Sequence, residues 1–159
     1  MGTLPQLIEE DVQGLEEAQR ELLEKSEATT AMVIDKGGFL ISSYGDARQF
    51  DITTIAALAS GAYLANQTIA NLVHETNFNS VYQQGERFSM FVLSVDEYCL
   101  LVVIFKAHVS VGVVKYFALP AGEKIAQAMR SAQERDPSNG LDLSVLNLAD
   151  TAELFKRKS

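Results

Sequence analysis

The residue types that most often do chemistry in proteins are few in this sequence. His74 and His108 are the only histidines among its 159 residues, and neither has a second ligand at the spacing of an HExxH motif or a CxxC pair. The single cysteine, Cys99, lies in an apolar run, which indicates a packed, unreactive thiol in a reducing compartment. His74 fits a cation near the end of a helix better than a general base. We therefore predict no metal site and no cofactor.

Nucleophilic and acid–base chemistry also lacks a recognisable pattern. No serine stands in a GxSxG context, and the acidic pairs Glu16-Glu17 and Asp96-Glu97 fall on an expected helix surface and in an expected turn. Arg48 and Arg87 lie in or near loops. We interpret both as solvated charges and not as arginines that stimulate GTP hydrolysis in a partner protein. We predict no catalytic residue and a protein that acts by binding other proteins.

Charge and hydropathy restrict the partners and the compartment. The formal net charge of −8 repels nucleic acid and anionic membranes. The amino terminus has no basic segment followed by an apolar stretch, so we expect no signal peptide and a cytoplasmic protein. The longest uncharged run, residues 52–73, contains too many Ser, Thr, Asn and Gln residues to span a bilayer.

The elements that would position any functional residue begin with a helix. Apolar residues at helical spacing predict an amphipathic helix over residues 4–24, with Thr3 and Gln6 as a capping box. Apolar residues on both sides of a glycine pair predict a β-hairpin over residues 30–44. Asp51 is a good N-cap for a long central helix that runs to about His74 or Glu75.

The second half of the chain predicts a meander followed by a helix. Three apolar, β-branched runs separated by short polar turns read as strands over residues 88–95, 98–105 and 109–117. A helix is expected from about Pro120 or Ala121 to Glu134. The predicted order is α-β-β-α-β-β-β-α, an α+β sandwich with one five-stranded antiparallel sheet.

A helix-breaking cluster, residues 136–140, closes this domain, which we place at residues 1–135. Residues 136–159 read as a linker and a short carboxy-terminal interaction helix, Ser144 to Lys158. A helix so short is marginal alone in water, which argues that it docks on something. Its expected contact residues are Leu148, Phe155, Lys156, Arg157 and Lys158.

The central helix carries more apolar surface than one face requires. One stripe at helical spacing is expected to face the sheet: Ile55, Leu58, Ala62, Ala65, Ile69 and Leu72. A second row, about a third of a turn away, has only small or apolar groups where a free helix would place Lys and Glu: Ala57, Gly61, Leu64 and Thr68. We interpret this second row as a protein interface, because a large exposed apolar patch is unusual on a monomer. The alternative is that both rows lie in a wide core of the same chain.

Three stretches carry a family resemblance: residues 31–45, residues 51–61 and residues 100–105, LLVVIF. They resemble the roadblock (dynein light chain) family, and most closely its bacterial MglB-type members, over about residues 5–135. The resemblance implies a homodimer with two central helices side by side and two five-stranded sheets joined at their edges.

The same resemblance implies a partner. MglB-type proteins activate MglA-type Ras-like GTPases of cell polarity and motility, and rearrange the GTPase's own switch residues without inserting a catalytic side chain. Their carboxy-terminal helix can touch the GTPase at a second place and affect nucleotide exchange. The role in cell polarity implies a cytoplasmic protein that is concentrated at a cell pole. Two alternatives stay open: a roadblock scaffold that docks a motor, kinase or filament, and a ligand sensor or enzyme with a cavity near Arg48, Tyr82 or Arg87.

Overall fold

The computed structural model describes residues 4–135 of the chain, and the predicted helix from Ser144 to Lys158 lies outside these residues. None of the described helices is long and apolar enough to cross a membrane. The elements, in chain order, are α1 (Glu9–Ser26), β1 (Thr30–Asp35), β2 (Leu40–Gly45), α2 (Ile52–Leu72), β3 (Ser80–Gln83), β4 (Phe88–Ser94), β5 (Cys99–Lys106) and α3 (Val111–Arg135).

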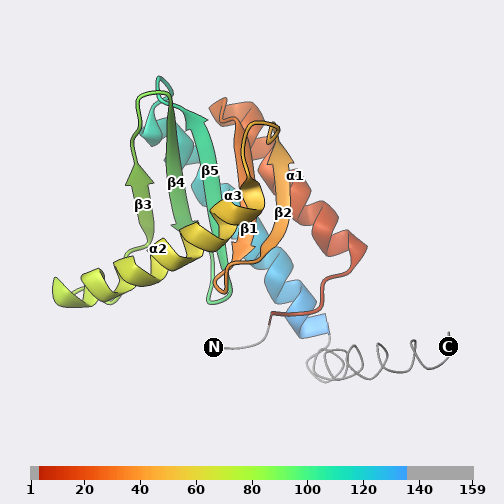
Figure 1. The fold of residues 1–159 in the computed structure, drawn as a ribbon. Helices are drawn as coiled ribbons and strands as arrows, with labels where there is room; N and C mark the ends of the chain where they lie inside the picture. The colour runs from red at the N-terminus through yellow and green to blue at the C-terminus, as the bar shows by residue number, and fades with distance from the viewer. Residues whose placement is uncertain (1–3, 136–159) are drawn as a thin grey trace, which may run out of the picture.

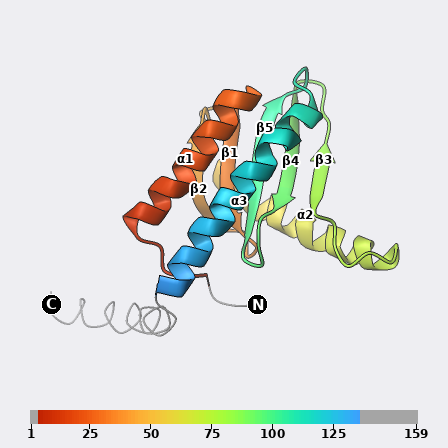
Figure 2. The same cartoon turned by 180° about the vertical axis from the view of Figure 1, so that it is seen from behind.

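The five strands form one antiparallel sheet in the order β2-β1-β5-β4-β3. Helices α1 and α3 lie side by side over one face, and α2 crosses the other face (Figures 1 and 2). The predicted element order and five-stranded antiparallel sheet are therefore confirmed. Figures 1 and 2 both show the carboxy-terminal end of α2 extending beyond the β3 edge.

Alternation along the strands fills a core on each side of the sheet. On β5, Leu101 and Val103 face α1 and α3, whereas Leu100 and Val102 belong to the cluster under α2. Strand β5 is central and covered on both faces, which explains why its sequence is a continuous apolar run without polar alternation.

The first helix begins later than predicted, at Glu9 and not in the first residues of the chain. Its cap comes from Asp11, whose Oδ2 accepts a 2.9 Å hydrogen bond from the backbone N–H of Ile8. The predicted capping box of Thr3 and Gln6 is wrong, because residues 4–8 are not helical and the helix begins at Glu9. Asp11 is buried and also accepts a 2.6 Å bond from Nη2 of Arg135, which ties the start of α1 to the end of α3.

We expect Asp11→Asn to reduce the free energy of unfolding by about 1–3 kcal/mol at pH 7, since a charge-assisted bond is lost. Burial raises the pKa of Asp11, but the bonds from Arg135 and Ile8 outweigh it and hold the pKa below its usual range. A lowered pKa stabilises the fold above the pKa of the unfolded carboxyl, about 3.9, and this contribution disappears as the pH falls through the folded-state value. Urea unfolding should therefore show a difference in the free energy of unfolding between the parent protein and Asp11→Asn at pH 7, and this difference should become smaller below pH 4. Glu10→Gln is the control. An equal difference at both pH values would contradict the stabilising role of the ionised Asp11 carboxylate.

The predicted strand over residues 109–117 is wrong, because α3 begins at Val111 and runs through Pro120 to Arg135. Strand β5 already has β1 and β4 on its two sides, so a strand that follows it directly has no free position beside it. The local signal for the helix is Ser110, whose Oγ accepts a 3.1 Å bond from the N–H of Gly112. Val114 of this run is fully buried in the core and Val109 and Val111 pack against it, whereas Val113 is exposed.

The fifth strand is β3, a four-residue edge strand that the sequence analysis missed. It pairs antiparallel with β4, with Val81 opposite Val92 and Tyr82 opposite Phe91. A strand of this length between polar loops has no periodicity long enough to distinguish it from a loop.

Candidate functional site: an exposed surface on helix α2

Helix α2 begins where the sequence predicts it. Asp51 accepts hydrogen bonds from the backbone N–H of Thr54 at 3.2 Å and from its hydroxyl at 2.7 Å, which confirms Asp51 as the N-cap. The helix then runs to Leu72 without a charged residue, and ends slightly before the predicted end at His74 or Glu75. The chain leaves the helix through His74, whose φ of 67° is left-handed.

The predicted core stripe of α2 is wrong. Leu58 and Leu72 are 68% and 74% exposed, and Ile69 is 48% exposed. The row that faces the sheet has smaller residues and one tyrosine: Ala56, Ala59, Ser60, Tyr63 and Ala70. Because apolar and small residues occur on more than one face of this helix, hydrophobicity alone could not identify the buried one. Small residues on α2 fit the bulky side chains that the sheet presents here, including those of Met32, Ile34 and Val102.

The second row lies away from the core. All four of its residues are exposed, and Leu64 is 51% exposed. Both predicted rows are therefore largely outside the core of the chain, contrary to the alternative of one wide core. We use the term α2 surface for ten exposed residues of this helix and its C-cap that are apolar or small, which are Ala57, Leu58, Gly61, Ala62, Leu64, Ala65, Thr68, Ile69, Leu72 and Val73.

Contacts with the β1–β2 turn and the sheet hold the α2 surface in a fixed position. Ser60 Oγ donates a 2.5 Å bond to the carbonyl of Lys36, whose Nζ lies 5.2 Å from the centre of the Tyr63 ring. Tyr63 in turn bonds Ser94 on β4 at 3.2 Å. Gly38 has a φ of +101°, and a Cβ at this position would lie 3.3 Å from the Cα of Ala57. The amino-terminal half of α2 is thus attached to the hairpin of β1 and β2.

A narrow apolar groove separates α2 from the β3 edge. Its walls include Tyr63 and Ala62 on the helix and Val81 and Met90 on the strands. Strand β3 is at the edge of the sheet, and within the described residues no strand pairs with its outer side. An open strand edge beside an exposed apolar helix is a surface suited to another protein chain.

The residues singled out for a ligand site do not come together. Arg48 follows the edge strand β2 and pairs with Asp46, which raises the pKa of the guanidinium, whereas Arg87 lies in the loop between β3 and β4, the two strands at the other side of the sheet. Tyr82 stacks on Phe105 with ring centres 6.1 Å apart. Burial raises the pKa of the Cys99 thiol, and within residues 4–135 no three acidic, histidine or cysteine side chains are grouped as metal ligands.

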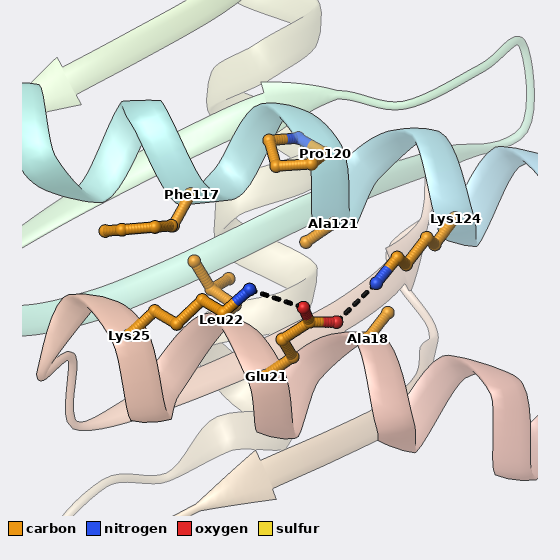
Figure 3. Close-up of a pocket in the computed structure, with 8 residues that line it drawn as sticks. All are labelled: Ala18, Glu21, Leu22, Lys25, Phe117, Pro120, Ala121 and Lys124. Carbon is orange, nitrogen blue, oxygen red and sulfur yellow. Dashed lines mark hydrogen bonds and ion pairs between the residues drawn. The ribbon is translucent and has the colours of Figure 1, made fainter.

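A cleft between α1 and α3 is too small for a ligand (Figure 3). Its volume is about 50 Å³, far below that of ordinary ligand pockets. Glu21 bonds Lys25 at 2.6 Å and also pairs with Lys124 on α3, and hydrogen bonds from Lys124 and Lys25 lower its pKa to about 2. This cleft is a contact between the two helices, so the α2 surface remains the candidate site.

Comparisons with known proteins show the family of the chain. Residues 14–105 match the model of the Roadblock/LC7 domain family. A solved structure of MglB with a tetrameric arrangement is 27% identical, with a TM-score of 0.78 over 83% of this chain and 99% of that chain. The gliding protein MglB of Thermus thermophilus (27%, TM-score 0.76, 82% and 99%) and MglB of Myxococcus xanthus (28%, 0.74, 80% and 96%) are similar. Comparison with curated proteins gives no match.

Proposed function

Because the chain belongs to the Roadblock/LC7 domain family, we propose that it is a homodimeric GTPase-activating protein for an MglA-type Ras-like GTPase in bacterial cell polarity or motility. The observation that carries this proposal is the α2 surface, where ten exposed positions have no charged side chain. A monomer would leave this surface in contact with water, which is unfavourable for exposed leucines and isoleucines. Protein partners would cover it.

The first partner is a second copy of the chain. An isologous dimer would place two α2 helices side by side and pair the open edges of two β3 strands. Supporting features are the exposed Ile69, Leu72 and Val73 at the end of α2, which extends beyond the β3 edge (Figure 1).

The second partner is the GTPase. Ala57 and Gly61 have almost no side chain, so a switch loop can approach the helix backbone closely. Ala57, Gly61, Leu64 and Thr68 cannot act as acids or bases, so the protein would stabilise a hydrolysis-competent arrangement of the partner's own residues. The carboxy-terminal segment would supply a second contact through Leu148, Phe155 and the Lys156-Arg157-Lys158 cluster, and this contact would aid nucleotide exchange.

A turnover assay tests the proposal. Light scattering of the purified chain should give the mass of a dimer, and single-turnover GTP hydrolysis by an MglA-type GTPase should accelerate when the protein is added. Binding without acceleration would favour the scaffold alternative. Absence of binding, or a monomer at micromolar concentration, would overturn the proposal.

A further inference from the structure

A second open surface lies on the face of the sheet opposite to α2. It is a groove of about 540 Å³ between α3 and the end of β4. Its floor includes Leu93, Gly122 and Ala126, which are buried, and its rim includes Glu123 and Arg130, which are exposed. The groove is therefore apolar below and polar above, as a site for an amphipathic helix should be.

The position of the groove in the fold explains why it is open. Two helices cover this face, and β3 lies at the sheet edge beside α3 (Figure 2). Helix α1 packs against the flank of α3 that contains Phe117 and Lys124. The opposite flank, with Leu119 47% exposed, faces the groove. Within the described residues no helix occupies this third position on the sheet face.

The chain itself continues from the end of this helix. Helix α3 ends at Arg135, five residues after the groove residue Arg130, and residues 136–159 follow. Pro137 is placed to end a helix, and residues 136–143 can span roughly 27 Å when extended. In the remaining segment, Leu148 and Phe155 stand seven residues apart, as do Leu119 and Ala126 in the groove.

We propose that residues 144–158 form a helix that packs antiparallel to α3 in the groove between α3 and β4 of the same chain. Seven residues of helix cover about 10.5 Å, so Phe155 reaches Leu119 when Leu148 reaches Ala126. The short tether gives the segment an effective concentration of about 1 mM, so a weak contact suffices to keep it docked. This contact goes beyond the proposed GTPase function, because it is made within one chain and needs no GTPase.

The test crosslinks the full-length protein in the absence of any GTPase. Antiparallel packing places Glu123 opposite Thr151, so Glu123→Cys with Thr151→Cys should react with a short bismaleimide within one chain. The matched control is Glu16→Cys with Thr151→Cys, because Glu16 is exposed on α1 and only one to two turns from Asp11, which contacts Arg135. Cys99 is buried in both proteins.

We expect the groove pair to crosslink within the chain at least about tenfold faster than the control, because docking holds the two cysteines of the groove pair together whereas the tether alone gives both pairs the same effective concentration of about 1 mM. Adding Leu148→Asp and Phe155→Asp should remove the difference. Equal rates for both pairs, or products with the mass of two joined chains only, would overturn the proposal. A protein that passes this test but fails to stimulate a GTPase would disprove the proposed function alone.

Discussion

Gly61→Arg is expected to reduce stimulation of GTP hydrolysis by about thirtyfold or more, which corresponds to the loss of about 2 kcal/mol typical of an interface hot spot. Gly61 is exposed in the middle of the α2 surface, and a Cβ at this position has no atom within 4 Å. The arginine can therefore extend into solvent in the isolated chain, and the fold should persist. In a complex, the same side chain would hold a partner away from the helix backbone and bring an unpaired charge into an apolar contact.

The matched control is Gly61→Ala, which adds a methyl group without charge. Alanine in an exposed helix interior is better than glycine by about 0.5–1 kcal/mol, so this variant should be slightly more stable and remain active. Ala57→Arg should also abolish stimulation, but Gly38 packs on Ala57, which makes Gly61 the cleaner site. Single-turnover hydrolysis and light scattering would be measured on each variant. Normal stimulation by Gly61→Arg would exclude this part of the surface as the GTPase contact.

Gly45→Ala is expected to lower the free energy of unfolding by about 3 kcal/mol, through backbone strain and overpacking. Gly45 ends β2 with a φ of +101°, a conformation that residues with a Cβ rarely adopt. The added Cβ would lie 2.4 Å from the carbonyl oxygen of Thr29 and 2.5 Å from Cδ1 of Leu23. The Thr29 oxygen accepts a 3.1 Å bond from the N–H of Asp46, so it cannot move without a further loss.

A glycine in a different environment provides the comparison. Gly14 is exposed within α1, and the nearest atom to its added Cβ is the Cβ of Ala128 at 3.9 Å. Gly14→Ala should therefore raise the free energy of unfolding by about 0.5–1 kcal/mol. Urea unfolding followed by circular dichroism measures both variants. If Gly45→Ala were as stable as the parent protein, the turn after β2 would have to be looser than its contacts indicate.

Local sequence patterns determined the elements whose signals lie within a few residues. The glycine pair of the hairpin, the Asp51 cap and the apolar run of β5 each predict a structure that was found. The absence of charge along α2 likewise predicted an exposed apolar surface, because a helix packs only part of its circumference against a sheet. The family resemblance rested on the same segments, and the match over residues 14–105 confirmed it.

Only the tertiary structure decided which strand occupies which place and which side of α2 is buried. The run after β5 has strand-like residues, yet β5 has neighbours on both sides and the run becomes helix α3. Strand β3 gains its identity from pairing with β4, not from its own four residues. On α2, packing against Met32, Ile34 and Val102 selected a row with Ala56 and Ala59 and left Leu58 and Leu72 in solvent. Shape complementarity made this choice, because apolar side chains lie on more than one side of the helix.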